Sequence, residues 1–147
     1  MSLDTKIPPP IVTIIILSII YLFDLNEYNL NTDIISIITL FIGLIFIISA
    51  VIQFINRKTT VNPTKPHKTS TLVITGTYKI TRNPMYLGML LLIISFALYK
   101  ASIISLILIP LFIFYINKFQ IEPEEFEMRK KFGKEYDEYC KKVDRWI

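Results

Sequence analysis

Four long runs without a charged residue constrain this chain more than any other feature of its sequence. Residues 7–23, 34–56, 83–99 and 101–117 contain no Asp, Glu, Lys or Arg, and they are 17, 23, 17 and 17 residues long. As helices these runs would extend about 25 to 35 Å, which matches a hydrocarbon core of about 30 Å. A soluble domain of 147 residues could not bury four of them. The sequence therefore predicts an all-α integral membrane protein with four transmembrane helices, at about 7–23, 34–56, 84–99 and 101–117.

The first run has a second interpretation as a cleavable signal peptide, because Lys6 precedes an apolar stretch. Three prolines at positions 8–10 open the stretch, and acidic and polar residues follow Phe23 in place of a small-residue cleavage site. We therefore expect a permanent first span and a single membrane domain covering residues 1–147.

The basic residues predict how the spans are oriented. Of the 16 Lys and Arg residues, 15 lie before the first run, between the second and third, or after the fourth, and only Lys100 lies elsewhere. The positive-inside rule then places both termini and the loop at 57–82 in the cytoplasm. The net charge of +4 follows from this topology, so we expect a multi-pass protein of a bacterial inner membrane with no nucleic-acid partner.

The sequence contains too few cysteine and histidine residues for a disulfide or for a metal site built from them. Cys140 is the only cysteine and His67 the only histidine, so the chain can form neither an intrachain disulfide nor a cysteine or histidine metal cluster. The four glycines are scattered and do not form the G-x-G-x-x-G fingerprint of dinucleotide sites. The sequence predicts no bound metal.

Two polar segments on the predicted cytoplasmic side are candidates for function. The loop at 57–82 is longer than a connection between two helices requires. After the fourth run, Pro123 suits a first helical turn and aromatic residues recur on one face, which predicts an amphipathic helix over about 123–142. Pro110 lies within the fourth run, where a proline is expected to kink the helix.

Three groups of residues in these segments carry side chains suited to binding or catalysis. They are Gly76 with Tyr78, the run from Arg82 to Gly88, and the pair Glu124 and Glu125 followed by a tail with Tyr136 and Arg145. Each group also has a plain structural interpretation. Asn83 can be an N-cap, Arg82 or Tyr86 an interfacial anchor, and the two glutamates partners of a helix dipole.

The order of these residues resembles a known family. The pattern T-G-x-Y-x-x-x-R-N-P-M-Y-L-G at 75–88 is followed, after an apolar hairpin, by E-E-x(6)-F-G-x-E-Y-x-x-Y-x(3)-V-x-R-W-I at 124–147. Together these blocks resemble the isoprenylcysteine carboxyl methyltransferases and phospholipid methyltransferases, which are integral membrane enzymes. The likeness covers roughly residues 57–147, whereas the first two spans match only in hydrophobicity.

The resemblance implies S-adenosylmethionine as methyl donor, bound at the cytoplasmic ends of the last two spans and the tail helix, and a lipidic acceptor that enters from the bilayer. It implies donor-binding roles for Gly76, Tyr78, Arg82, Asn83, Pro84, Tyr86, Gly88, Glu124, Glu125 and Tyr136. These residue types fit the donor. Carboxylates can accept from its ammonium and hydroxyl groups, an arginine can hold its carboxylate, and tyrosines can stack on adenine or face the sulfonium.

Two acceptor chemistries stay open. A prenylcysteine carboxylate is already ionised near neutral pH and needs no base, so Arg82 or Arg145 would be the catalytic residue that orients it. A lipid amine must lose a proton, which requires a carboxylate or tyrosine base that the sequence does not single out. We expect an isoprenylcysteine carboxylate as acceptor, with a phospholipid amine as the alternative.

A membrane scaffold or a transporter subunit is the competing, non-enzymatic class of function. None of the four runs contains the charged residue that ion pathways usually need, and a scaffold gives no use for a pair of acidic residues. We therefore expect an enzyme whose acceptor site opens to lipid beside the fourth helix.

Overall fold

The computed structural model describes residues 7–23, 32–56 and 72–147. Most of the predicted loop at 57–82 thus lies outside the described residues. Within them all regular secondary structure is helical, with no strand. The elements are α1 (Pro9–Phe23), α2 (Asp33–Asn56), a 3-10 turn η2 (Gly76–Lys79), α3 (Pro84–Tyr99), α4 (Ser105–Ile116), a π-helical turn η3 (Asn117–Ile121), α5 (Glu122–Phe132) and α6 (Lys134–Lys142).

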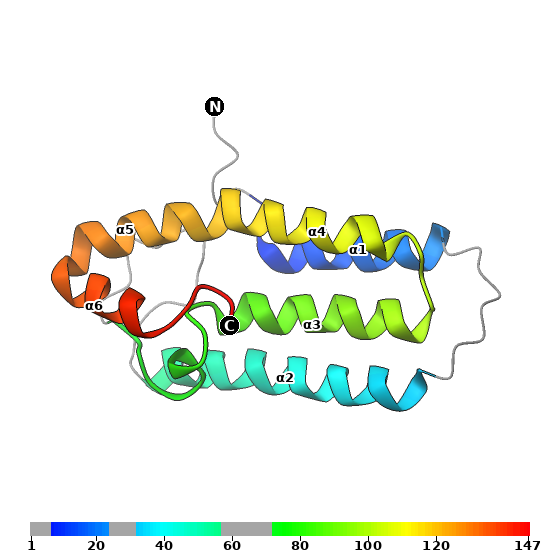
Figure 1. Cartoon of the computed structure of the whole chain (residues 1–147), viewed down its shortest axis with the longest axis horizontal. Coiled ribbons are helices and arrows are strands. Elements are labelled where there is room, and N and C mark those ends of the chain that lie inside the picture. The colour runs from blue at the N-terminus through cyan, green and yellow to red at the C-terminus, as the bar shows by residue number, and fades with distance from the viewer. Residues whose placement is uncertain (1–6, 24–31, 57–71) are drawn as a thin grey trace.

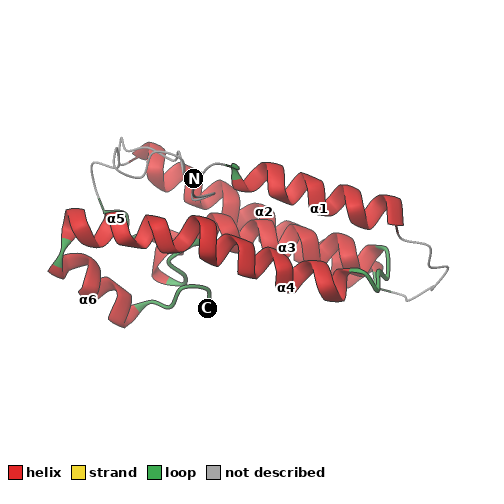
Figure 2. Cartoon of the chain, turned by 90° about the horizontal axis from the view of Figure 1, so that it is seen from above, coloured by secondary structure: helices red, strands yellow, loops and turns green. Residues whose placement is uncertain are grey.

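Helix α3 is the centre of the arrangement. The helices α1 to α4 run along the long axis of the molecule, and α5 and α6 extend beyond one end of this bundle (Figures 1 and 2). Helix α3 packs against α1, α2 and α4. The main core is apolar and includes the fully buried Ile20 of α1, Ile93 of α3, and Phe112 and Ile116 of α4.

Two glycines let α2 and α3 approach closely. A Cβ atom on Gly88 would lie 2.7 Å from the carbonyl oxygen of Gly43 and 2.5 Å from Cγ1 of Ile47, so any larger residue would push the helices apart. Small residues at such crossings are typical of helix packing in membranes, where close van der Waals contact replaces the hydrophobic effect.

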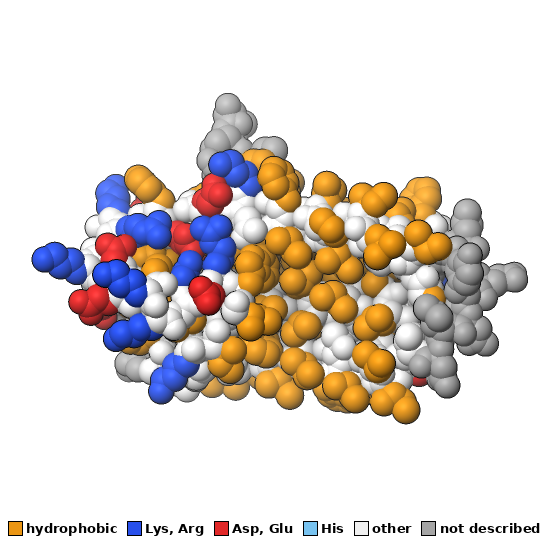
Figure 3. All heavy atoms as spheres, viewed as in Figure 1, with side chains coloured by type: hydrophobic (Ala, Val, Ile, Leu, Met, Phe, Trp, Pro, Cys, Tyr) orange, Lys and Arg blue, Asp and Glu red, His pale blue; other side chains and the backbone are white. Residues whose placement is uncertain are grey.

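The surface of the bundle is suited to lipid. On α2 the apolar side chains of Ile34, Phe41 and Ile45 are exposed by 72%, 60% and 61%. Apolar side chains cover the bundle in Figure 3, while the Lys, Arg, Asp and Glu side chains gather at the end that carries α5 and α6. A continuous apolar surface of this extent marks a membrane-contacting face, so the protein is membrane-associated.

Within the described residues, two helices are long and apolar enough to cross a membrane. They are α2, with 24 residues, and the continuous helix Ser105–Phe132, with 28 residues. The shorter apolar helices α1 and α3 have 15 and 16 residues. In the long helix the first charged side chain is that of Lys118, so its apolar segment ends by Asn117 and α5 lies beyond it.

The C-terminal region differs from the single helix predicted over 123–142. The structure has two helices there, α5 and α6, separated by Gly133 with φ +52°. Glycine enters this backbone region without the steric penalty of a Cβ, so the helix breaks at that point and α6 folds back. Pro123 does lie in the first turn of α5, as predicted, but α5 is not a separate helix, because α4 continues into it through η3.

Candidate active site at the charged end of the bundle

Arg82, Glu125 and Arg145 form a cluster that joins three segments distant in sequence. Nη2 of Arg82, which precedes α3, donates to Oε1 of Glu125 on α5 at 2.9 Å. Arg145, in the C-terminal segment at 143–147, donates from Nε to Oε1 at 3.1 Å and from Nη2 to Oε2 at 2.8 Å. Both oxygens of this buried carboxylate are therefore engaged by charge-assisted hydrogen bonds.

The electrostatics of the cluster favour its ionised form. Burial opposes ionisation of Glu125, but the hydrogen bonds and positive charges of Arg145 and Arg82 outweigh burial and lower the pKa of this carboxyl below its ordinary value. Two arginines and one carboxylate leave the cluster with a formal charge of +1. The site can therefore attract one further anionic group.

The backbone carbonyl groups of the segment at 143–147 accept hydrogen bonds from the chain just before α3. The amide of Arg82 donates to the carbonyl oxygen of Asp144 at 2.9 Å, and its Nη1 donates to that of Val143 at 2.6 Å. The carbonyl oxygen of Arg145 accepts from Nδ2 of Asn83 at 2.9 Å and from Oγ1 of Thr81 at 3.1 Å.

These contacts decide the role of the Asn83 side chain in the fold. Its amide makes no cap hydrogen bond to α3, although Asn83 occupies the N-cap position and Pro84 the first turn. The N-cap interpretation of this side chain is therefore wrong. The side chain instead fixes the C-terminal segment, while Pro84, whose φ suits a helix start, begins α3.

Glu124 faces a different environment from its neighbour. The hydroxyl group of Tyr86, on α3, donates to Oε1 of Glu124 at 2.5 Å. Burial raises the pKa of Glu124 to about 8, with the charge of Glu125 adding to the effect and the Tyr86 hydrogen bond opposing it. Adjacent glutamates thus differ in charge at neutral pH: Glu125 is ionised and Glu124 is mostly protonated.

The predicted aromatic site residues lie at the same end of the bundle. Tyr136 on α6 is 5% exposed, and the guanidinium of Arg129 lies 5.8 Å from the centre of its ring. Tyr78 in η2 is buried, its ring meets that of Phe54 edge to face at 5.6 Å, and its carbonyl oxygen accepts from the Tyr139 hydroxyl group at 2.6 Å. Burial raises the pKa values of Tyr78 and Tyr136, so both hydroxyl groups stay protonated at neutral pH.

The predicted glycines have structural reasons to be glycine. Gly76 has φ +61° and a Cβ there would meet the side chain of Gln53 on α2, while Gly88 lies in the α2–α3 crossing. The donor-binding roles of both glycines stay predictions. Hydrogen bonds instead connect the other predicted site residues at this end of the bundle: Arg82, Asn83, Tyr86, Glu124, Glu125 and Arg145.

The sequence analysis did not predict a role for Thr81, nor the contact that Trp146 of the second motif block makes. Thr81 is fully buried and bonds both Arg145 and the amide of Asn83. Trp146 donates from Nε1 to Oδ1 of Asn117, at the start of η3, at 3.0 Å. A buried threonine gives no sequence signal. The single tryptophan, next to the predicted site residue Arg145, does give one, because a buried indole N–H usually has a hydrogen-bond partner.

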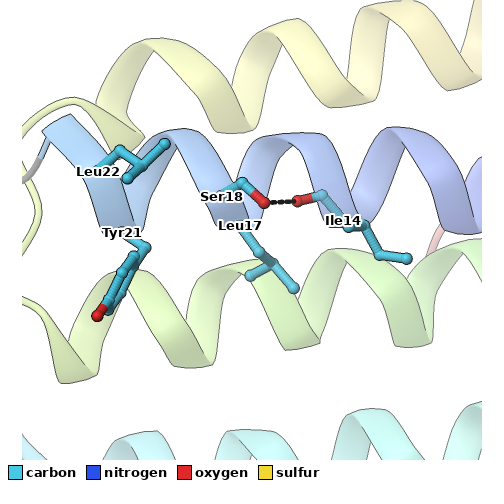
Figure 4. Close-up of a pocket in the computed structure, with 5 residues that line it drawn as sticks. All are labelled: Ile14, Leu17, Ser18, Tyr21 and Leu22. Atoms are coloured by element: carbon cyan, nitrogen blue, oxygen red, sulfur yellow. Dashed lines mark hydrogen bonds between the residues drawn. The ribbon is translucent and has the colours of Figure 1, made fainter.

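An open groove on α1 lies apart from this cluster. It has a volume of about 350 Å³ and is lined only by α1 residues: Ile14, Leu17, Ser18, Tyr21 and Leu22 (Figure 4). The Ser18 hydroxyl group is used within the helix, where it donates to the carbonyl oxygen of Ile14 at 2.8 Å. The lining is otherwise mostly apolar, and none of it belongs to the polar site residues.

The fold and site define a membrane-associated helical protein with a cluster of arginine and glutamate side chains at one end of its bundle. A family model described as phospholipid methyltransferase matches residues 32–135. The chain therefore belongs to the phospholipid methyltransferase family, as its motifs indicated, and this membership implies methyltransferase activity.

Two further comparisons add less. An uncharacterized protein of Haemophilus influenzae is 40% identical over 63 residues, which make up 43% of this chain and all of that protein. No solved structure matches the chain significantly.

Among the residues that the structure describes, no group of three or more His, Cys, Asp or Glu side chains could hold a metal ion.

Proposed function

We propose that this protein transfers a methyl group from S-adenosylmethionine to a lipid with its reactive head at the cytoplasmic interface. The observation that carries the proposal is the polar cluster of Arg82, Glu125 and Arg145, beside the Tyr86–Glu124 pair and at the end of an apolar bundle. In this proposal α1 to α4 all cross the membrane, both termini face the cytoplasm, and residues 1–147 form one domain.

The residues present suit the donor. Nε of Arg82 is buried and has no hydrogen-bond partner among the described residues, so this guanidinium retains one donor for an acceptor such as a carboxylate. The cluster's formal charge of +1 favours the same group. Glu124 can accept from the donor's ammonium or ribose, and Tyr78, Tyr86 and Tyr136 supply aromatic surface for its adenine or sulfonium.

The bound donor would supply an electrophilic methyl group on its sulfonium, with the electrons of the breaking S–C bond returning to sulfur. The chain's own contribution is to hold the two reactants in line and to keep water out. The network from Thr81 to Arg145 serves the first task, because each of its segments is fixed by more than one hydrogen bond. The apolar core beneath Tyr86 serves the second.

Glu124 bears on the class of acceptor. Both arginines of the cluster already bind Glu125, whereas the carboxyl group of Glu124 is bound only by a tyrosine hydroxyl group in the described structure. An ammonium head group beside Glu124 would favour its ionised form, and that carboxylate could then take the ammonium proton before the nitrogen attacks. This observation puts a phospholipid amine first.

An isoprenylcysteine carboxylate, which the sequence resemblance favours, is the second candidate. The observation in its favour is that the side chain of Arg145 is 33% exposed, so this guanidinium could turn toward an acceptor carboxylate. In that case no base is required and Arg145 would be the catalytic residue.

Calorimetric titration of the detergent-purified protein with S-adenosylhomocysteine tests the donor site. We expect saturable binding by the folded protein, and its absence would overturn the proposed function. Methyl transfer from labelled S-adenosylmethionine should then be compared for phosphatidylethanolamine vesicles and for farnesylcysteine in the same vesicles. Faster transfer to a water-soluble amine or carboxylate than to either lipid would refute a lipid acceptor.

The tail of the acceptor gives a second test. Pro110 and its exposed neighbours Leu106, Ile107 and Leu111 offer an apolar surface on α4. If the tail lies there, substitutions of these apolar residues should raise the KM for the lipid more than the KM for the donor. The reason is that this surface would bind the tail equally in the ground state and in the transition state.

A further inference from the structure

The C-terminal segment at 143–147 is anchored at two places. One anchor is the chain before α3, through Thr81, Arg82 and Asn83. The other is the junction of α4 and η3, through the hydrogen bond from Nε1 of Trp146 to Oδ1 of Asn117 at 3.0 Å. Arg145 lies between these anchors, so its side chain and its carbonyl oxygen are held from both sides.

In the second anchor, Asn117 lies outside both motif blocks, whereas the residues of the first anchor lie within them. Asn117 begins the π-helical turn η3, a helix irregularity that is often found at functional sites. Trp146 also packs its ring against the main apolar core, which includes Ile116 and Ile121 on either side of that turn. The indole therefore contributes both packing and one directional hydrogen bond.

From this geometry we infer that Trp146 is a positioning residue, which acts through Asn117 to hold Arg145 and the chain at 81–83 in register with Glu125. The inference rests on the proposed donor site for its consequence in catalysis, and on the contacts above for the coupling itself. The hydrogen bond from Trp146 to Asn117 fixes the position of residue 146 along the axis of α4. The adjacent residue 145 then meets Asn83, Thr81 and Glu125 at hydrogen-bonding distance.

The coupling can be measured without any ligand. Trp146→Phe keeps most of the ring packing and removes the N–H donor, and Asn117→Leu removes the acceptor from the other side. Hydrogen exchange of the Arg82 amide, which is bonded to the carbonyl oxygen of Asp144, reports whether the segment stays in place. We expect exchange at this amide to accelerate about tenfold in both single variants and by no more than that in the double variant, since they break one bond.

A control separates positioning from general loosening. Tyr99→Phe changes an exposed aromatic residue at the opposite end of the bundle and should leave exchange at Arg82 unaltered. Unchanged exchange in Trp146→Phe, or equal acceleration throughout α3 in that variant, would overturn the inference. Additive effects of Trp146→Phe and Asn117→Leu on this exchange rate would also overturn the inference.

The catalytic consequence has a separate readout. In Trp146→Phe the affinity for S-adenosylhomocysteine should fall about tenfold while the melting temperature changes by little, and Asn117→Asp, which keeps an acceptor oxygen, should restore most of the affinity lost in Asn117→Leu. If the wild-type protein fails to bind this ligand, the proposed function fails, and exchange at Arg82 still decides whether Trp146 positions the segment. Unaltered affinity alongside accelerated exchange would refute the claim that the register matters for the site.

Discussion

Replacing Glu125 and Glu124 separately by glutamine should give opposite results, although the two residues are adjacent and chemically identical. Glu125 is 5% exposed and accepts three hydrogen bonds from two arginines. Glu124 accepts one, from the hydroxyl group of Tyr86. The structure therefore assigns a structural ion pair to one residue and a protonated, chemically available carboxyl group to the other.

The expected magnitudes follow from these partners. Removing one member of a buried ion pair costs about 3 to 5 kcal/mol. Because the side chain of Arg145 is 33% exposed, water can compensate part of the loss, and we expect about 3 kcal/mol for Glu125→Gln. Glu124→Gln keeps an oxygen for Tyr86 and removes no charge from the folded protein at pH 6.5. It also removes the cost of protonating this carboxyl group on folding, so the variant should be at least as stable as the wild type at this pH.

Thermal unfolding of both variants in the same detergent at pH 6.5 measures the difference. On the scale of soluble proteins of this size, about 3 kcal/mol lowers the melting temperature by roughly 6 to 12 °C. Donor affinity measured on the folded fraction then tests function: Glu125→Gln should weaken binding at least tenfold because it releases both arginines. Equal destabilisation by the two variants, or a larger loss in Glu124→Gln, would refute this reasoning.

Three further predictions rest on other parts of the structure. The pKa of Glu124 is raised to about 8 from an ordinary value of 4.5, so its ionisation opposes folding. Its contribution to stability should be full below about pH 4.5, fall as the pH rises from there to about 8 and level off above 8, and this fall should vanish in Glu124→Gln thermal melts. Gly88→Leu should destabilise the protein by about 1 to 3 kcal/mol in thermal unfolding, because its side chain would collide with α2. In intact cells an impermeant thiol reagent should label a cysteine placed at Tyr99 and spare the native Cys140; labelling of both would contradict the four-span topology.

The helices could be predicted where the sequence marks both of their ends. Helix α3 begins at Pro84 and ends at Tyr99, as predicted, and α2 extends the predicted 34–56 by one residue. A proline that fixes φ and a charged residue that cannot enter the apolar run are local signals. The division of the C-terminal helix at Gly133 was missed because the aromatic spacing was followed through a glycine that breaks the helix.

The candidate site could be predicted as a set of residues but not as a set of contacts. Neighbouring helix positions point about 100° apart, so Glu124 and Glu125 meet different partners, and only the fold decides which of them meets arginine. The same holds for Asn83: an asparagine before a proline indicates an N-cap, yet here a tertiary contact with the Arg145 carbonyl oxygen replaces the local one. The contribution of Trp146 depends on Asn117, which lies 29 residues away and outside both motif blocks.

The convergence of the two motif blocks follows from the lengths of the helices between them. Helix α3 has 16 residues, and α4 with η3 has 12 and 5, so the rising and returning segments are nearly equal in length, at about 24 to 26 Å for a rise of 1.5 Å per residue. A short turn joins them at the far end. Arg82, just before α3, and Glu125, just after η3, must then return to the same level, where the apolar run ends and charged side chains begin. In the proposed reaction a polar donor from the water and a lipid head group at the interface would meet at that level, so the hairpin would place the arginine–glutamate cluster where the proposed chemistry requires it.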